Sequence, residues 1–259
     1  MSSKWIFDRI ISLLGLVGLS WLFFVITVII KIKTGGRVFY SQIRVGRNGR
    51  LFCCHKFRTM KGEQEISPVA ALEQSRITPI GKTLRRYHLD ELPQLWDVLI
   101  GNMSFVGPRP DVPGYADKLE GDDRDVLKLR PGITGPATLK YRLEDEMLEA
   151  FVYRVKNGLN GLKGDSSNSS NSSNSSNSSN SSNSSNSSIS LNLSNISNLP
   201  DFSGLSDQEI SVWYNDNVIY PDKVRLNCYY YRHYSFISDI KIIFATIFGK
   251  KIKYAGEEI

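Results

Sequence analysis

At 259 residues, with a long stretch of low complexity, the chain is too short for two full-sized domains, so we expect one compact domain with appendages. Its composition, 41% hydrophobic and 22% charged, is ordinary for a folded protein and excludes a chain that is disordered throughout. A net charge of +6 indicates an anionic partner, and nucleic acid, a membrane surface and a phosphorylated substrate are the three candidates.

A continuous apolar run near the N-terminus predicts a membrane segment. No charged residue occurs between Arg9 and Lys31, and an apolar helix of about 20 residues matches the thickness of a bilayer core. A signal peptide would have a shorter apolar stretch followed by small residues at a cleavage site, whereas this run ends in Lys31 and Lys33.

Two topologies remain open for this segment on the residues alone. Basic residues flank both of its ends, which favours both flanks in the cytoplasm and therefore a helix that enters the bilayer, breaks and returns. Gly15, Gly18 and Ser20 weaken the middle of the helix, but no proline forces a break, so a straight span is the alternative.

The next segments carry clear periodicities. Residues 36–60 alternate in polarity on either side of a Gly-Arg-Asn-Gly turn, which predicts a β-hairpin. Residues 79–100 have apolar side chains at helical spacing. Pro93 suits the first turn of a helix, which makes Asp90 or its neighbour the expected N-cap.

Loops and one further helix are expected around and beyond these elements. Residues 61–75 are polar, and residues 101–113 and 130–136 are rich in proline and glycine, so all three predict loops. Residues 114–129 are amphipathic and predict a helix.

The composition changes after this region. Ser-Ser-Asn triplets repeat without interruption over residues 166–186, and such a segment cannot bury apolar area, so we expect a disordered insert. Each Asn-Ser-Ser is formally a glycosylation acceptor, which would need an extracellular location. Beyond the insert, a helix is expected from about Phe236, and it fits a membrane interface or a protein core equally well. Its apolar face comprises Ile237, Ile240, Ile243, Phe244 and Ile247.

The basic residues cluster in or beside loops rich in glycine and proline. Arg109 lies between Pro108 and Pro110, where a stiff backbone suits a planar, bidentate grip on phosphate. A nucleic-acid partner is disfavoured because the chain shows no helix-turn-helix, zinc finger or aromatic RNA platform. The other basic residues of this kind are Lys56, Arg58, Arg76, Lys82, Arg85, Arg86, Arg130 and Arg142.

Asp90-Glu91 is the one carboxylate pair in this basic neighbourhood. The structural interpretation is an N-cap aspartate with a first-turn glutamate that complements the helix dipole. The functional interpretation uses the same geometry, because a helix N-terminus attracts phosphate and an aspartate placed there can attack phosphorus. A neighbouring glutamate could hold Mg²⁺ to bridge a diphosphate.

Three segments resemble a known family. HKFRTM (55–60), RITPIGKTLRRYHLDELPQLWDVLIGNMSFVGPRP (76–110) and RPGITGP (130–136), in this order and spacing, are similar to the bacterial sugar transferase family, the monotopic phosphoglycosyl transferases. The resemblance covers residues 4–142 and resumes weakly over 213–248.

The resemblance implies a two-step, ping-pong reaction. Asp90 matches the nucleophile that attacks the β-phosphate of a UDP-sugar and releases UMP, after which the phosphosugar passes to a polyprenyl phosphate of the undecaprenyl type. This would be the first membrane step of surface glycan synthesis. Glu91 matches the acid associated with Mg²⁺, so the metal is expected at Glu91 and Asp90.

The resemblance also assigns roles to the basic residues. Arg109, with its flanking prolines, matches a contact on the nucleotide side, and Arg85 and Arg142 match phosphate-binding arginines. Further candidates for substrate binding are Lys56, Arg58 and Arg130.

Two departures from the family pattern bear on these expectations. Family members commonly have Ser-Pro at the break in the membrane helix, whereas this chain has Ser20-Trp21. The stretch after RPGITG often begins with tryptophan, whereas here it reads PATLKYR. The family nevertheless favours a re-entrant helix, with the catalytic face in the cytoplasm at the inner membrane.

The expected fold is therefore α/β mixed (α+β), mostly helical with a short β-hairpin, a re-entrant N-terminal membrane helix and interfacial amphipathic helices. The expected parts are an anchor (1–35), a catalytic core (36–156), a disordered insert (157–204) and a C-terminal part of the core (205–259). The expected partners are a UDP-sugar, polyprenyl phosphate and the lipid bilayer, without nucleic acid and with a homodimer left open. A catalytically inactive, membrane-attached scaffold is the alternative.

Overall fold

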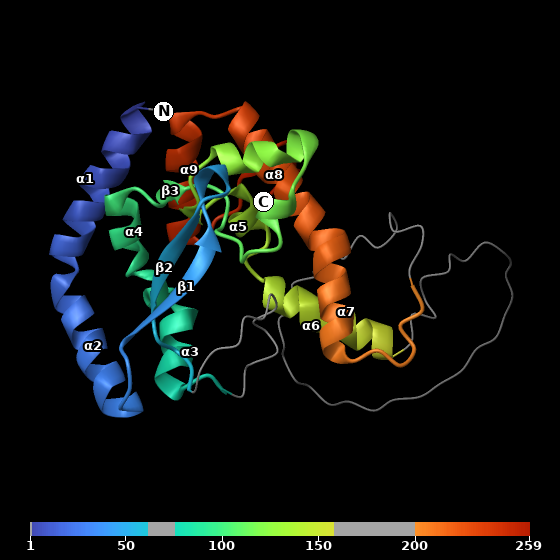
Figure 1. The fold of residues 1–259 in the computed structure, drawn as a ribbon, viewed down its shortest axis with the longest axis horizontal. Helices are drawn as coiled ribbons and strands as arrows, with labels where there is room; N and C mark the ends of the chain where they lie inside the picture. The colour runs from blue at the N-terminus through green and yellow to red at the C-terminus, as the bar shows by residue number, and fades with distance from the viewer. Residues whose placement is uncertain (1, 62–75, 158–199) are drawn as a thin grey trace, which may run out of the picture. The chain divides into compact units, whose positions relative to one another are not determined.

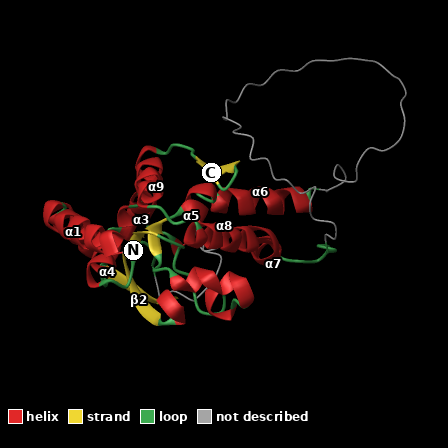
Figure 2. Ribbon diagram, turned by 90° about the horizontal axis from the view of Figure 1, so that it is seen from above, coloured by secondary structure: helices red, strands yellow, loops and turns green. Residues whose placement is uncertain are grey.

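The computed structural model describes residues 2–61, 76–157 and 200–259. The chain divides into two compact units, of which the larger comprises Met1–Arg142 with Asn215–Ile259 and the smaller Leu143–Tyr214. The described residues contain nine α-helices and three two-stranded sheets (Figures 1 and 2). The expected fold class, mixed α/β and mostly helical with a short hairpin, is confirmed.

The larger unit holds seven of these helices and all the strands. Short 3₁₀ turns connect several of them, and a π-helix at Asn215–Ile219 precedes α8. In chain order the elements are α1 (Ser2–Gly18), α2 (Ser20–Thr34), β1 (Phe39–Val45), β2 (Leu51–Phe57), α3 (Pro79–Arg86), α4 (Gln94–Ile100), β3 (Ser104–Val106), β4 (Gly132–Thr134), α5 (Pro136–Lys140), α8 (Tyr220–Arg232), α9 (Phe236–Phe248), β5 (Lys253–Tyr254) and β6 (Glu257–Glu258).

The N-terminal apolar run forms two helices instead of one. Leu19 separates α1 from α2, at the position between Gly18 and Ser20. No single helix of the described residues is long and apolar enough to cross a membrane, whereas Ser3–Gly18 and Ser20–Thr34, bent by 60°, meet that measure as a pair.

Polar side chains fasten the first turns of α1 to the rest of the larger unit. Lys4 Nζ donates to Asp239 Oδ2 of α9 at 2.6 Å, and the Ser104 hydroxyl donates to Asp8 Oδ2 at 2.8 Å. Asp8 and Asp239 are both buried. Since a buried carboxylate is tolerated only when its oxygens are paired, these contacts fix the position of the first turns of α1 on the larger unit.

The hairpin forms as the alternation predicts. β1 pairs antiparallel with β2 in the register Phe39↔Phe57 to Val45↔Leu51. Asn48 and Gly49 at its turn both have positive φ, a conformation that these two residue types adopt readily.

The region from 79 to 100 contains two helices separated by a turn. α3 ends at Arg86, His88 adopts a left-handed conformation with φ of 53°, and Leu89–Glu91 form a 3₁₀ turn. α4 then begins at Gln94 with Pro93 at its N-cap and no capping side chain. The expectation that Asp90 or its neighbour caps this helix is therefore wrong, because Pro93 holds the cap position and Asp90 and both its neighbours lie in the preceding turn.

Two other local predictions are corrected, and strand pairing explains the second. Residues 114–129 form 3₁₀ turns at Ala116–Lys118 and Gly121–Lys128 in place of an amphipathic α-helix. The expected loops 101–113 and 130–136 contain β3 and β4, which pair in parallel, with Ser104↔Gly132 and Val106↔Thr134 in register.

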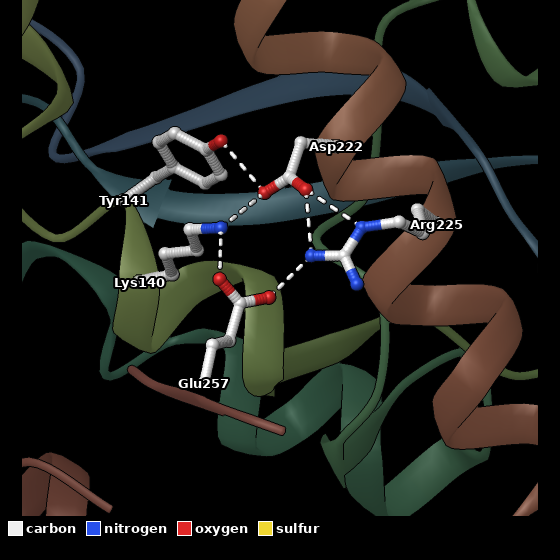
Figure 3. A network of polar contacts seen from close by, with 5 residues as sticks. All are labelled: Lys140, Tyr141, Asp222, Arg225 and Glu257. Carbon is white, nitrogen blue, oxygen red and sulfur yellow. Dashed lines mark hydrogen bonds and ion pairs between the residues drawn. The ribbon is translucent and has the colours of Figure 1, made fainter. Parts of the chain in front are cut away.

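Residues from both sides of the insert build the main core of the larger unit. Its buried cluster combines Val106, Leu129 and Leu139 with Tyr230, Ile242, Ala245 and Ile259. A polar network lies beside it (Figure 3): Lys140 Nζ donates to Asp222 at 2.7 Å and to Glu257 at 2.5 Å, and Arg225 pairs with the same two carboxylates. The segment after the insert is thus part of the same folded unit as the segment before it.

The helix expected from Phe236 is confirmed as α9. Its buried positions are Asp239, Ile242 and Ala245, whereas Ile237, Phe244 and Ile247 of the predicted apolar face are exposed. The face that periodicity singled out is therefore only partly covered in the described chain.

The smaller unit consists of α6 (Glu144–Lys156) and α7 (Asp207–Tyr214). Phe151 of α6 stacks on Tyr214 with ring centroids 4.1 Å apart, and Phe202 packs edge-on against both Phe151 and Trp213. The Ser-Ser-Asn repeat and most of the predicted loop 61–75 lie outside the described residues.

Candidate active site

Apolar neighbours hold the Asp90-Glu91 pair in the larger unit. Leu89 and Leu92, on either side of the pair, pack against a buried cluster formed by Ile26 and Ile30 of α2, Phe57 of β2 and Leu84 of α3. The two carboxylate residues are thereby drawn inside, with only 8% of Asp90 and 9% of Glu91 exposed.

Two cations from different elements meet on one oxygen of Glu91. Lys56 Nζ, from β2, donates to Glu91 Oε1 at 2.7 Å. Arg109 Nη2, from the loop after β3, donates to the same oxygen at 2.8 Å. Of the residues singled out in the sequence, the structure therefore brings Lys56 and Arg109 into direct contact with the carboxylate pair.

The environment drives the pKa values of the two carboxyl groups apart. Burial raises the pKa of Asp90, the negative charge of Glu91 raises it further, and Lys56 and Arg85 oppose both effects. Burial also acts to raise the pKa of Glu91, but Arg109 and Lys56 outweigh it and hold that pKa well below the usual range. A pair separated in this way is typical of catalytic carboxylates with two different roles.

A hydrogen bond to Thr59 holds Arg85 near Asp90. Its Nε donates to the buried Thr59 hydroxyl at 3.0 Å. Thr59 is in turn fixed by Thr78, the N-cap of α3, whose backbone N–H and hydroxyl both donate to the Thr59 carbonyl, at 2.9 and 3.0 Å. The charge of Arg85 is therefore held within electrostatic reach of Asp90.

Both prolines beside Arg109 have their carbonyls fixed. Gly132 N donates to the Pro108 carbonyl at 2.7 Å, and Arg44 Nη1 of β1 donates to the Pro110 carbonyl at 3.1 Å. Burial and the charge of Arg109 lower the pKa of Arg44, so the two guanidinium groups lie near each other. Arg44 was missed in the sequence, where the only signal was its place on a strand of the hairpin.

Three other candidates have contacts elsewhere among the described residues. Arg58 Nε donates to the Met60 carbonyl at 3.0 Å. Arg142 Nη2 lies 3.5 Å from the Ala245 carbonyl near the end of α9. The pKa of Arg130 is lowered by burial and by Arg9 and Arg47, which groups it with those two arginines.

Close backbone packing explains the glycines of the two Gly/Pro-rich loops. A Cβ on Gly107 would overlap the carbonyl oxygen of Arg130, and a Cβ on Gly132 would overlap the backbone N of Gly107. Gly107 N also donates to the Thr134 carbonyl at 2.9 Å. The loop that carries Arg109 can therefore approach β4 only because these positions lack a side chain.

We expect Gly107→Ala to destabilise the protein by about 3 kcal/mol, because backbone atoms cannot move aside as a flexible side chain can. Thermal unfolding in detergent would measure the change. Gly18→Ala is the matched control, since a Cβ at Gly18 meets no atom within 4 Å. Equal stability of the two variants would contradict the packing argument.

Comparisons with known proteins identify the family of this chain. A family model described as "Bacterial sugar transferase" matches residues 1–162. The exopolysaccharide production protein ExoY of Sinorhizobium fredii is 39% identical over 150 residues, which cover 51% of this chain and 66% of that protein. The matched part is thus just under two thirds of this relative's length.

Two longer relatives carry names that state a reaction. The undecaprenyl-phosphate galactose phosphotransferase of Salmonella typhimurium is 44% identical over 123 residues, covering 40% of this chain and 25% of that protein. The UDP-glucose:undecaprenyl-phosphate glucose-1-phosphate transferase of Xanthomonas campestris is 37% identical over 159 residues, which cover 59% of this chain and 33% of that protein. Since the family model matches more than half of the residues of this chain, the chain belongs to the bacterial sugar transferase family.

Proposed function

We propose that this protein transfers a sugar-1-phosphate from a UDP-sugar to a polyprenyl phosphate of the undecaprenyl type and releases UMP. The observation that carries the proposal is the buried Asp90-Glu91 pair, in which Lys56 and Arg109 hold one oxygen of Glu91. The names of the Salmonella and Xanthomonas relatives support a polyprenyl-phosphate acceptor, and the name of the Xanthomonas relative also supports a UDP-sugar donor.

In the first step, a carboxylate oxygen of Asp90 attacks the β-phosphorus of the UDP-sugar. The bond between that phosphorus and the oxygen bridging to the α-phosphate breaks, and UMP leaves with the electron pair. The product is a phosphosugar joined to Asp90 as an acyl phosphate. Burial favours this step because a desolvated carboxylate is a stronger nucleophile than a hydrated one.

In the second step, a phosphate oxygen of the polyprenyl phosphate attacks the same phosphorus. The bond to Asp90 breaks, its carboxylate is restored, and the lipid leaves as a polyprenyl diphosphate sugar. Both steps exchange one phosphorus–oxygen bond for another, so neither needs an oxidant or a reductant. Phosphoryl transfer of this kind depends mainly on positioning and on positive charge.

The basic residues around the pair supply that charge. Lys56, Arg85 and Arg109 together carry one positive charge more than the two carboxylates they face, and Arg44 adds another beside Arg109. A diphosphate therefore enters a site with an excess of positive charge. Arg109 can turn from Glu91 to a phosphate, because half of its side chain is exposed.

Mg²⁺ is part of the proposal, and the donor set fits it. No group of three or more metal-binding side chains occurs in the described ranges, but Mg²⁺ is commonly held by one or two carboxylates together with substrate phosphates and water. Asp90 and Glu91 are the residues that would hold it. When bound, it would supply neutralisation of the diphosphate charge.

The proposed setting is the cytoplasmic face of the inner membrane, at the first membrane step of surface glycan synthesis. The bent pair α1 and α2 supports a re-entrant anchor, because the pair reaches membrane length and hydropathy with a 60° break. Exposed Ile237, Phe244 and Ile247 on α9 support an interfacial helix. The name of the ExoY relative supports an exopolysaccharide pathway.

Release of UMP by the detergent-solubilised full chain tests the proposal. We expect one UDP-sugar of a panel, given with Mg²⁺ but without lipid, to yield a single burst of about one UMP per enzyme and to label the protein. Added undecaprenyl phosphate should discharge the label and restore turnover. Turnover that needs both substrates at once, with no burst and no labelled protein, would refute the ping-pong mechanism, and no UMP from any donor would refute the proposed reaction.

A further inference from the structure

Besides Asp8 and Asp239, another buried aspartate lies outside the proposed catalytic pair and has no part in the mechanism above. Asp97, in α4, is 0% exposed. Both of its oxygens accept hydrogen bonds from His55 of β2: Oδ2 from the backbone N–H at 3.0 Å and Oδ1 from Nδ1 at 2.8 Å. The Asp97 carboxylate thus binds both the main chain and the side chain of His55, which is far away in sequence.

The hydrogen bond from the His55 backbone N–H gives a partner to a donor on the open edge of β2. Among the described residues, β2 pairs with β1 alone in a two-stranded sheet, so the outward N–H groups of β2 have no partner strand there. The carboxylate of Asp97 takes the place of a strand carbonyl at His55. A backbone donor that is partly withdrawn from water needs such a partner, and the bond therefore fixes where α4 meets β2.

A parallel bridge lies one residue further along β2. His55 is followed by Lys56, whose Nζ donates to Glu91 Oε1 at 2.7 Å. Consecutive residues of β2 thus contact the segment that carries the proposed catalytic pair at two points, Glu91 and Asp97. The side chains of consecutive strand residues point to opposite faces of the sheet. A slip of β2 by one residue would therefore turn His55 and Lys56 away from Asp97 and Glu91 and break both contacts.

Asp97 is itself held in place by its own main chain. Its carbonyl accepts from Asn102 N at 2.9 Å and from Met103 N at 3.0 Å, where α4 ends. The Asp97 side chain therefore projects from a main chain that these hydrogen bonds hold in place at the end of α4. Burial raises the pKa of Asp97, whereas the bonds from His55 oppose that change.

We propose that Asp97 and His55 are a positioning pair, which sets the register of β2 against the 89–100 segment and so places Lys56 on Glu91. This inference rests on the proposed function for its effect on catalysis, but not for the contact itself. If the pair only stabilised the fold, the effect of its loss on kcat would not depend on Lys56. Coupling between the kcat effects of Asp97 and Lys56 variants therefore distinguishes a positioning role from a purely structural one.

A double-mutant cycle on kcat for UMP formation tests that coupling. We expect Asp97→Ala to lower kcat about tenfold or more, as small displacements of catalytic groups do. Asp97→Asn should rescue most of the loss, because its amide oxygen can accept from the His55 N–H and its amide nitrogen can donate to the ring. Asp123→Asn, at an exposed aspartate, is the matched control and should leave kcat unchanged.

The cycle is closed with Lys56→Met. If Asp97 acts through Lys56, the Asp97→Ala/Lys56→Met double variant should lose little more than about twofold beyond Lys56→Met alone. A double variant that shows the full product of the two single losses would overturn the positioning role. An Asp97→Asn variant as impaired as Asp97→Ala would also count against it.

Hydrogen exchange of the peptide 51–57 gives a measurement that does not depend on activity. We expect this peptide to exchange faster in Asp97→Ala than in the wild type, Asp97→Asn or Lys56→Met. Unchanged exchange in Asp97→Ala would overturn the proposed contact. Faster exchange in Asp97→Ala, combined with a wild type that yields no UMP from any donor, would instead refute the proposed function and leave the β2–α4 contact standing.

Discussion

Asp90→Asn is expected to abolish turnover and at the same time to raise the stability of the folded protein at neutral pH. Loss of the nucleophile should lower kcat by at least about 10³-fold. The gain in stability follows from the burial of Asp90, which is the main cause of its raised pKa. Removing a charge that the folded state disfavours should therefore make the variant more stable than the wild type.

The pH dependence of this difference has a definite sign. With a raised pKa, the folded state binds the proton of Asp90 more tightly than the unfolded state does. The resulting stabilisation is complete below the unfolded pKa of about 3.9 and is lost as the pH rises through the folded-state value. Asp90→Asn should not show this loss, so the two stability curves should separate as the pH rises.

Thermal unfolding in detergent between about pH 4 and pH 7 would measure this separation, alongside the UMP assay. The wild type should lose stability relative to Asp90→Asn over this range. A variant that is inactive and also clearly less stable at neutral pH would show that the Asp90 carboxylate stabilises the fold, and the argument from burial would then be wrong.

Glu91→Gln is expected to change stability in the opposite direction. Its carboxylate is paired with Lys56 and Arg109, and those cations lower its pKa in spite of its burial. Breaking a fully buried ion pair costs about 3–5 kcal/mol. Here 24% of Lys56 and 50% of Arg109 remain exposed, so solvent screens the cations left behind and we expect a loss of about 2 kcal/mol.

This loss should also depend on pH. A lowered folded-state pKa gives a stabilisation that is present above the unfolded value of about 4.3 and disappears as the pH falls through the folded-state value. Wild type and Glu91→Gln should therefore differ most at neutral pH and converge in strong acid. Denaturant unfolding at several pH values would measure this, with exposed Glu146→Gln as the control. A constant difference at all pH values would contradict it.

The elements with a strong local signal could be predicted from the sequence. The hairpin followed from alternation around Asn48-Gly49, and α9 followed from apolar residues at helical spacing. The break between α1 and α2 falls at Leu19, beside the glycine and serine that weaken the helix there. These features depend on residues close together in the chain, which is what a periodic pattern records.

Other features depended on partners that no local pattern reveals. The left-handed His88 divides a continuous helical pattern into α3 and α4 and moves Asp90 from a helix cap into a turn. Residues 130–136, which read as a loop, contain a strand because β3 lies beside them and the glycine backbones pack closely. Tertiary pairing thus overrode local composition.

By itself, the sequence determined which residues could form the site: a carboxylate pair, and arginines and a lysine in stiff or regular segments. Only the tertiary structure decided that Lys56 and Arg109 share one oxygen of Glu91, because these three residues come from separate elements. The same holds for the contact between His55 and Asp97. Side chains far apart in sequence meet only when the elements pack, and their distances set the charge and pKa of the site.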